Sequence, residues 1–488
     1  MARKHDDSEV GERGGDLFRK IGLWLLVVAI LAVLVHFAAR GGNLASGPAP
    51  PTPLGPVVSA WEQTRDLCGD VPKNGRPVVL TLAYGPDIKT FIAAASERFA
   101  RRCPHIEIKH QVMDELKAAD AAAKGALASS LWIVGSELAV SLAAAARSGS
   151  TAPAQAAPVL FSSPYVFLAW EDRAELLQDL FRSPASSEGA WVQLSCPLLP
   201  RAADAHGPTG SQATAGSWAD WYRASSPPPA LPQPPGRRTK RAASVALPSA
   251  EAPLSLAEVQ RWGPVKFRHT SPVRAALGLG TLYLVVHDYL HPPQTRTNEP
   301  ASAADLSQTL MQQAPSLQAW LRRCRGDLGP LPETEARLIQ ELEEQGPARS
   351  DVIAVTEHAA LALLSRRAAH GGAVRGLRIL YPATSLRNEY RAVFTAPSSA
   401  EGQAAAEIGR KWIAFLLRDD LQRLAIESGL RPGNAGVAIR DHDVPTNPFL
   451  SLRRRGVELS LRQDAPPAID AAAARTLMKI WEDAVLTN

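Results

Sequence analysis

Residues 77–148 alternate short apolar runs with segments of helical periodicity, and this alternation restricts the fold more than any other feature. The runs RPVVLTLAYG, IEIKHQV and SLWIVGS have the length and β-branched content of strands. Helical patterns separate them, and Pro86 stands in the first turn of the first helix. Strands that alternate with helices pair in a parallel sheet with both faces covered. We therefore expect an α/β fold with a ligand site beyond the carboxyl ends of the strands.

A proline interrupts the next strand-like run, APVLFSSPYVFLAW, at residues 157–170. Central parallel strands rarely carry proline, so we expect this segment to leave one sheet and enter another. Residues 225–253 are rich in proline, serine and alanine and lack the apolar content of a packed element. We expect them to form a disordered insertion on the surface. Strand and helix patterns then resume and continue to the last helix, AAARTLMKIWEDAVL.

An apolar run at residues 21–39, IGLWLLVVAILAVLVHFAA, has about the length that a helix needs to cross a bilayer. Arg19 and Lys20 precede it and a neutral spacer follows, so the positive-inside rule leaves residues 1–20 in the cytoplasm. We expect a transmembrane helix at 21–39 and a linker, rich in glycine and proline, at 40–75. The rest of the chain would then be extracytoplasmic, in the periplasm. A signal peptide cleaved near NLAS is the alternative.

The composition argues against several classes of function. Lys plus Arg total 53 against 48 Asp plus Glu, and the resulting net charge of +5 is spread over 488 residues. No basic block with interleaved aromatic residues appears, so a nucleic-acid partner is not supported. The common hydrolase, zinc, nucleotide and dinucleotide signatures are also absent from the sequence. We expect no enzymatic activity, no catalytic residues, no cofactor and no metal site.

Four cysteines would lie in an oxidising compartment, where disulfides are allowed. Cys68 precedes the first predicted strand and Cys103 follows the next helix, so both should reach the same rim of a βα unit. We expect a bridge between them. A second bridge between Cys196 and Cys324 is a weaker expectation, and free buried thiols are the alternative.

Polar residues recur where a predicted strand meets the start of a helix. Any one of these segments is explained by ordinary helix capping, but several together predict a cleft lined by helix N-termini, hydroxyls and N–H groups. In particular, Ser271 before Pro272 predicts a helix start at about 272, and the same helix start could seat an anion. Arg274 would add a positive charge there. The segments are 84–87, 135–136, 162–163, 269–271, 356–357 and 381–384.

Several stretches are similar in content and order to one family of proteins. They include VVLTLAYGPDIKTFIAAASERFARRCPHIEIKHQV, SSPYVFLAW, WGPVKFRHTSPVRAALGLGTLYL, YPATSLRNEYRAVF and AAAEIGRKWIAFLLRDDLQRLAIESGLRPGN. In this layout the chain resembles bacterial extracellular solute-binding proteins of the type 2 periplasmic-binding class, a group that includes sulfate- and molybdate-binding components. The resemblance covers roughly residues 76–486. The order of the segments carries the resemblance, since no single motif is diagnostic.

The resemblance implies two α/β lobes joined by crossover strands, with a ligand buried in the cleft between them. Lobe 1 would comprise residues 76–165 and 390–488, and lobe 2 would comprise residues 166–389 with the insertion at 225–253. The implied ligand-binding residues are Tyr84, Gly85, Ser136 and Ser162 from lobe 1, and Thr270, Ser271, Glu357 and Tyr381 from lobe 2, with Arg274 beside them.

The function expected from this reading is capture of a small polar or anionic ligand by a membrane-anchored, extracytoplasmic solute-binding protein. Its partners would be the small-molecule ligand and a transporter permease of the ABC type or another membrane protein. The alternative is a sensor or scaffold domain that has lost its ligand.

Overall fold

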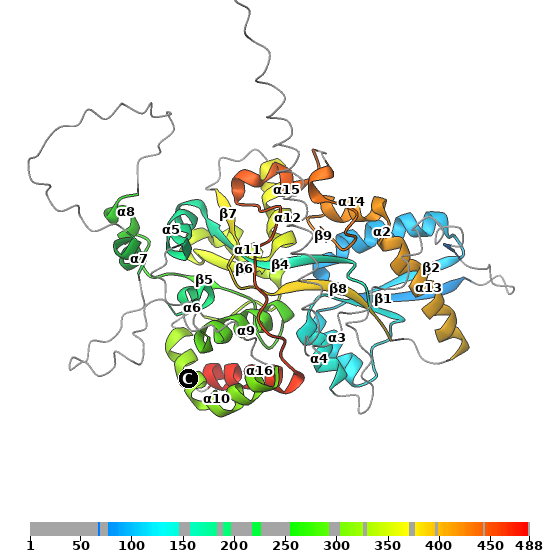
Figure 1. Cartoon of the computed structure of the whole chain (residues 1–488), viewed down its shortest axis with the longest axis horizontal. Coiled ribbons are helices and arrows are strands. Elements are labelled where there is room, and N and C mark those ends of the chain that lie inside the picture. The colour runs from blue at the N-terminus through cyan, green and yellow to red at the C-terminus, as the bar shows by residue number, and fades with distance from the viewer. Residues whose placement is uncertain are drawn as a thin grey trace, which may run out of the picture. The chain divides into compact units, whose positions relative to one another are not determined.

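A computed structural model provides the structure of the chain (Figure 1). The chain divides into Met1–Ser59 and a compact unit, Ala60–Asn488, which contains every residue described. The predicted segments 1–20 and 21–39 lie outside the described residues, as do the linker 40–75 apart from Leu67 and Cys68, and the insertion 225–253 apart from Ser225. Within the described part, no helix is both long and apolar enough to cross a membrane. The described residues are 67–68, 77–145, 157–182, 189–196, 217–225, 254–291, 303–325, 329–369, 376–395, 399–442 and 445–486.

The first part of the chain forms the predicted parallel sheet. Strand β1 pairs in parallel with β2 on one side and with β3 on the other. The strands are β1 (Val78–Tyr84), β2 (Ile106–Val112) and β3 (Leu131–Val134), and the elements between and after them are η1 (Pro86–Ile88), α2 (Lys89–Arg102), α3 (Glu115–Ala123) and α4 (Glu137–Ala144). Helices α2, α3 and α4 agree with the helical patterns of the sequence.

The second group of strands is mostly antiparallel. Strand β4 pairs with β6 and β7 in antiparallel fashion, and β5 adds to β6 in parallel. The whole path runs β2-β1-β3-β8-β4-β6-β5, with β7 and β9 also paired to β4. The strands are β4 (Phe161–Trp170), β5 (Phe267–Arg268), β6 (Val352–Thr356), β7 (Leu377–Leu380), β8 (Arg387–Phe394) and β9 (Arg431–Pro432).

Strands β4 and β8 cross between the two groups. Residues 161–164 of β4 pair with β8, and residues 165–170 pair with β6 and β7. The far end of β8 pairs with β3. Pro164 stands opposite Arg387, at the point where β4 changes partners. The prediction that this segment passes from one sheet to another is therefore confirmed.

Both faces of the main strands are buried, as the apolar runs predict. In β4, Tyr165, Phe167 and Ala169 belong to one core cluster. Val166, Leu168 and Trp170 belong to another, on the opposite face. Strand β3 divides in the same way, with Leu131 and Ile133 in one cluster and Trp132 and Val134 in another.

Helices cover these faces (Figure 1). Helices α13 and α14 contribute to the core on β1 and β3, whereas α11 and α12 lie on one face of β4 and β6. Helix α16 packs against α10, α9 and α4. The helices that follow α4, including those just named, are α5 (Glu171–Arg182), α6 (Ala190–Ser195), α7 (Trp218–Ser225), α8 (Leu256–Gln260), α9 (Ala276–Leu290), α10 (Ala303–Arg325), α11 (Glu335–Gln345), α12 (Glu357–Ala369), α13 (Ala400–Leu416), α14 (Asp419–Glu427), α15 (Pro448–Ser451) and α16 (Ala471–Leu486). The 3-10 turns among them are η5 (Gly346–Ala348), η6 (Ile439–Asp441) and η7 (Arg453–Arg455).

The lobe boundaries drawn from the sequence stay a prediction. Residues of α15 and α16 lie in the core clusters of β4 and β6, although the predicted lobe 1 included all of 390–488. Helices α13 and α14, from the same predicted segment, lie with β1 and β3.

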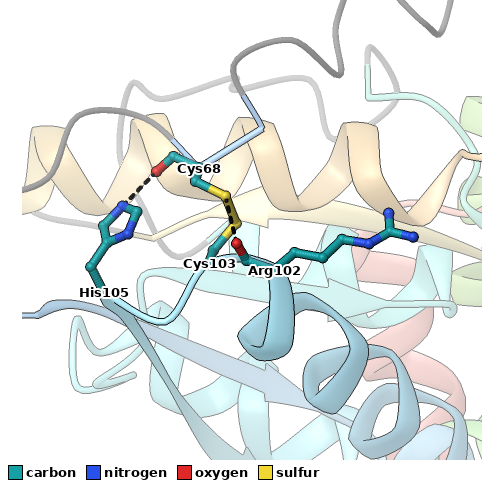
Figure 2. The surroundings of a disulfide bond; sticks show 4 residues. All are labelled: Cys68, Arg102, Cys103 and His105. Atoms are coloured by element: carbon teal, nitrogen blue, oxygen red, sulfur yellow. Dashed lines mark hydrogen bonds between the residues drawn. A yellow bond between two sulfur atoms is a disulfide. The ribbon is translucent and has the colours of Figure 1, made fainter.

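Both cysteine pairs are joined. Cys68 is bonded to Cys103, with 5.2 Å between their Cα atoms, and Cys196 is bonded to Cys324, with 4.5 Å. Figure 2 shows the first bridge, where the Nε2 of His105 donates a hydrogen bond to the carbonyl of Cys68 at 3.0 Å. The first bridge holds the segment before β1 against the end of α2, on the rim that the sequence indicated.

The predicted helix start at Pro272 is wrong. Residues 272–274 form a turn, and α9 begins at Ala276 after Ala275, which has no capping side chain. Serine followed by proline is also typical of the first two positions of a β-turn, and here the carbonyl of Ser271 accepts from the N–H groups of Arg274 and Ala275. The turn folds back on the helix: a Cβ at Gly278 would lie 2.4 Å from the carbonyl oxygen of Thr270.

Candidate functional site

A cluster of buried and half-buried polar side chains lies around the ends of β1, β3 and β6 and the first half of β4. Tyr165 of β4 is at its centre: its pKa is raised well above the ordinary value by burial and then by the charges of Glu115, Glu335, Asp87 and Asp114. Tyr165 stands opposite Thr356, which Glu335 contacts, and it lines a cavity with Gly135 and Ser136, which Glu115 contacts. We call this region the central polar cluster; its members are Asp87, Asp114, Glu115, Ser163, Tyr165, Glu335, His358 and Tyr390.

Glu115 accepts hydrogen bonds from backbone N–H groups at the end of β3. As the first residue of α3 it reaches Gly135 at 2.7 Å and Ser136 at 2.9 Å. The side chain is 6% exposed. Burial and the neighbouring charge of Asp87 raise the pKa of Glu115 to about 8, against the opposing effect of the two N–H donors.

Glu335 makes the corresponding contact at the end of β6. It is the first residue of α11, and its carboxyl accepts from the N–H of Thr356 at 2.6 Å and from the hydroxyl of Thr356 at 2.9 Å. Burial raises the pKa of Glu335 above its ordinary value. Helix α12 begins at the next residue, Glu357.

His358 and Asp87 connect elements from the two groups of strands. The N–H of His358 donates to the hydroxyl oxygen of Ser163 at 3.0 Å. The Nε2 of His358 donates to the carbonyl of Asp87 at 3.3 Å, so Nδ1 is left to accept from Ser163, also at 3.3 Å. The carboxyl of Asp87 in turn accepts from the hydroxyl of Tyr390. This network ties η1 to α12 through direct contacts.

Glu357 forms a buried ion pair with Arg431 of β9. The Nε and Nη2 atoms of Arg431 donate to the two carboxylate oxygens at 2.6 and 2.7 Å, and Tyr381 donates its hydroxyl to the same carboxylate. The carbonyls of Leu459 and Glu458 accept further hydrogen bonds from Nη1 and Nη2 of Arg431, so that four of its five N–H donors are used. A bidentate pair of this kind is strong and specific in geometry.

The other predicted residues of lobe 1 are dispersed. Tyr84 is buried, with its hydroxyl 3.0 Å from the Nδ1 of His110, and Gly85 precedes the 3-10 turn η1. Ser136 caps α4 and accepts from Ala139 at 3.3 Å. Ser162 lies in the part of β4 that pairs with β8 and β9.

The predicted residues around the start of α9 do not gather into one site. The hydroxyl of Thr270 is buried and has no hydrogen-bond partner among the residues described. Ser271 donates its backbone N–H to Pro332. Arg274 is 62% exposed and lies 3.9 Å from Glu333. The ligand-binding role of all nine predicted residues remains a prediction.

Two cavities touch the predicted residues. The first, of about 470 Å³, is lined by arginine and serine side chains and by loop residues. Arg387 and Arg440 are exposed, whereas Arg431 is buried in its ion pair. No Asp or Glu is among the lining residues in the described part of the chain. We call it the arginine-lined pocket; its lining is Ser162, Arg387, Arg431, Pro432, Val437, Ala438, Ile439, Arg440, Leu459, Ser460 and Leu461.

The second cavity, of about 490 Å³, lies between the start of α4 and the segment before α16. Ser136, Tyr165 and Tyr283 line it together with apolar residues such as Leu386 and Ile469. The hydroxyl of Tyr283 donates to the carbonyl of Pro467, which also lines the cavity. The cavity has both signs of charge in its wall, from Glu137, Glu389, Arg387 and Arg391. This mixture does not select one class of ligand.

Four important residues were not singled out from the sequence. Glu115 and Glu335 stand at helix starts, where an acidic residue is ordinary, so only the fold reveals that they reach another helix. Arg387 and Arg440 have no local motif. Arg387 lies in the stretch YPATSLRNEYRAVF, which stood out in the sequence only for its resemblance to the family, and it is the first residue of β8. Among the described residues, no group of three His, Cys, Asp or Glu side chains is placed to hold a metal ion.

No family model matches the sequence, and no curated protein matches it. Solved structures of binding proteins resemble the chain. The sulfate-binding protein SubI from Mycobacterium tuberculosis H37Rv is 12% identical, with a TM-score of 0.39 over 80% of this chain and 94% of its own. The substrate-binding protein of an ABC transporter from Agrobacterium tumefaciens is 11% identical, with a TM-score of 0.44 over 85% and 95%. The apo ferric ion-binding protein A from Pasteurella haemolytica is 10% identical, with a TM-score of 0.45 over 84% and 99%.

These three solved structures are binding proteins for sulfate, for a transporter substrate and for ferric ion. At these identities and scores the likeness concerns the general fold. A function for this chain has to come from its own residues.

Proposed function

We propose that the chain is an extracytoplasmic binding module, held by an N-terminal membrane anchor, that takes a small anionic ligand in the arginine-lined pocket. The observation that carries the proposal is the charge of this pocket. Arg387 and Arg440 bring positive charge to it, the charge of Arg431 is balanced by Glu357, and the described lining holds no carboxylate. Carboxylate, sulfate and phosphate groups match the planar donor set of arginine.

The two exposed arginines are the ones available to a ligand. Arg431 already uses most of its donors on Glu357 and on backbone carbonyls, so its role is to shape the wall. Within the described part of the chain, no carboxylate pairs with Arg387 or Arg440. Ser162 and Ser460 add hydroxyl groups to the same wall. The volume of about 470 Å³ suits a small molecule.

The test is calorimetric titration of the full chain in detergent with sulfate, phosphate and citrate. We expect at least one of these anions to bind. The double substitution Arg387→Ala/Arg440→Ala should weaken that binding about tenfold or more, because hydrogen bonds to charged groups are lost. Arg410→Ala is the control, since it removes an exposed arginine of α13 outside the pocket. Equal affinity in the wild type and the double variant, or no binding of any of the three, would contradict the proposal.

A second candidate function is a sensor or scaffold that needs no ligand. The observation in its favour is the central polar cluster, where Glu115 and Glu335 already use the N–H groups that an anion would need. In both cases the partner would be a membrane protein, such as a transporter permease, and no catalysis is proposed. Retained interaction with that partner by the Arg387→Ala/Arg440→Ala variant would favour the scaffold.

A further inference from the structure

Two helix starts in this protein hold a carboxyl group that comes from another helix. At the first, the carboxyl of Glu115 in α3 accepts hydrogen bonds from the N–H groups of Gly135 and Ser136, directly before α4. At the second, the carboxyl of Glu335 in α11 accepts hydrogen bonds from the N–H and the hydroxyl of Thr356, directly before α12. In both places the donor segment is the end of a buried strand, and the carboxyl belongs to the first residue of a helix.

These contacts differ from ordinary helix caps. A cap is supplied by the residue next to the helix, and α4 already has one in Ser136, whose hydroxyl accepts from Ala139. Glu115 is 20 residues away from Gly135 in sequence, and Glu335 is 21 residues away from Thr356. Unpaired N–H groups at the junction of a strand and a helix are where free oxyanions bind in proteins. A carboxyl from elsewhere in the chain has taken that place twice.

The two carboxyls lie in one region. Glu335 contacts Thr356, which stands opposite Tyr165 in the sheet. Glu115 contacts Gly135 and Ser136, which line one cavity together with Tyr165. An oxyanion that entered would find these N–H groups already used and further carboxyls close by.

We infer that Glu115 and Glu335 serve as intramolecular ligands, which complete the central polar cluster without a solute and exclude free oxyanions from it. The inference rests on residues other than those of the arginine-lined pocket, so either can fail without the other. It goes beyond the proposed function because it assigns a conformational role: each carboxyl holds the start of one helix, α3 or α11, against the junction of a strand with another helix.

The test exploits a match in size. The atoms removed from the side chain by Glu→Ala correspond to one acetate, so acetate should refill the vacated position. We expect Glu115→Ala and Glu335→Ala to lower the Tm of the full chain, and acetate to restore about 2 °C or more relative to chloride at equal ionic strength near pH 6. The wild type should show no difference between the two salts.

Apolar neighbours on the same helices provide matched controls. Leu116→Ala on α3 and Leu338→Ala on α11 also leave space, but they expose no N–H donors to it. We expect both to lose stability without any acetate-specific recovery. Sulfate, which is larger, should not restore the glutamate variants. The measurement is the Tm of each variant by scanning calorimetry in the three salts.

Two outcomes would overturn the inference. One is the absence of an acetate-specific rise in both glutamate variants, and the other is an equal rise in the leucine variants or the wild type. If an alanine variant does not fold in chloride, its refolding yield becomes the readout. Recovery in acetate alone would support the inference, whereas failure in every salt would reject it.

Discussion

Asp114 and Glu115 are adjacent acids at the start of α3, and both titrate far from their ordinary range. Burial, with Asp87 adding its charge, raises the pKa of Asp114 to about 6 and that of Glu115 to about 8. In the unfolded chain such groups titrate near pH 4. Between that value and the folded pKa, the folded protein binds more protons than the unfolded chain. The contribution of these two groups to the free energy of unfolding is therefore greatest at low pH. It falls as the pH rises and is lost above about pH 6 for Asp114 and about pH 8 for Glu115.

This reasoning predicts how Glu115→Gln changes the pH profile of stability. The variant cannot lose a proton at position 115, so the wild type should lose Tm relative to the variant as the pH rises from about 5 to about 8. Calorimetric scans of both proteins at unit steps of pH give the difference directly. If the Tm of the wild type minus the Tm of the variant stays constant or rises with pH, the pKa of Glu115 is not raised in the folded protein.

Individual site residues were predictable only where their chemistry is local. Ser136 was expected at a strand end and does cap α4, because capping depends on a few neighbouring residues. The ligand contact expected of Glu357 stays a prediction, but its carboxylate pairs with Arg431, 74 residues away in sequence. No local pattern can show such a partner, and the same holds for the contact between Glu335 and Thr356.

At the scale of elements, the strands and helices of residues 77–145 follow from the sequence because β1 and β3 are almost continuously apolar and the segments around them have helical periodicity, although β2 at the edge of the sheet is largely exposed. The crossing of β4 also follows, since Pro164 cannot donate to a sheet ladder. The start of α9 could not be predicted from the sequence, because Ser271 and Pro272 fit a turn as well as a helix start. A choice between these two structures depends on Pro332, which accepts the N–H of Ser271.

The two disulfides stabilise loops of different length, and this predicts an order of effects. In the chain-entropy account, loss of the Cys196–Cys324 bridge should cost about 5 kcal/mol and loss of the Cys68–Cys103 bridge about 4 kcal/mol, because the sequence separations are 128 and 35. Cys196→Ala/Cys324→Ala should therefore lower the Tm more than Cys68→Ala/Cys103→Ala. The reverse order in scanning calorimetry would show that native packing, and not loop closure, dominates.

For the whole molecule, the proposed topology makes a prediction about protease access. Because Arg19 and Lys20 stand on one side of the apolar run 21–39, the unit Ala60–Asn488 should lie outside the cytoplasmic membrane. Protease added to intact spheroplasts should digest it, whereas a cytoplasmic marker protein should stay whole. Protection of this unit until the cells are lysed would reject the topology.

The Cys68–Cys103 bridge determines where a mechanical load would enter this unit. A pull from an anchor at the N-terminus would reach Cys68 and pass through the covalent bond to Cys103, between α2 and β2. The force would then bypass β1, which is held between β2 and β3. With the bridge reduced, the same pull would run along the backbone into β1 and load its hydrogen bonds. If the chain is anchored at its N-terminus as proposed, the oxidised bridge would keep tension on that anchor from separating β1 from β2 and β3.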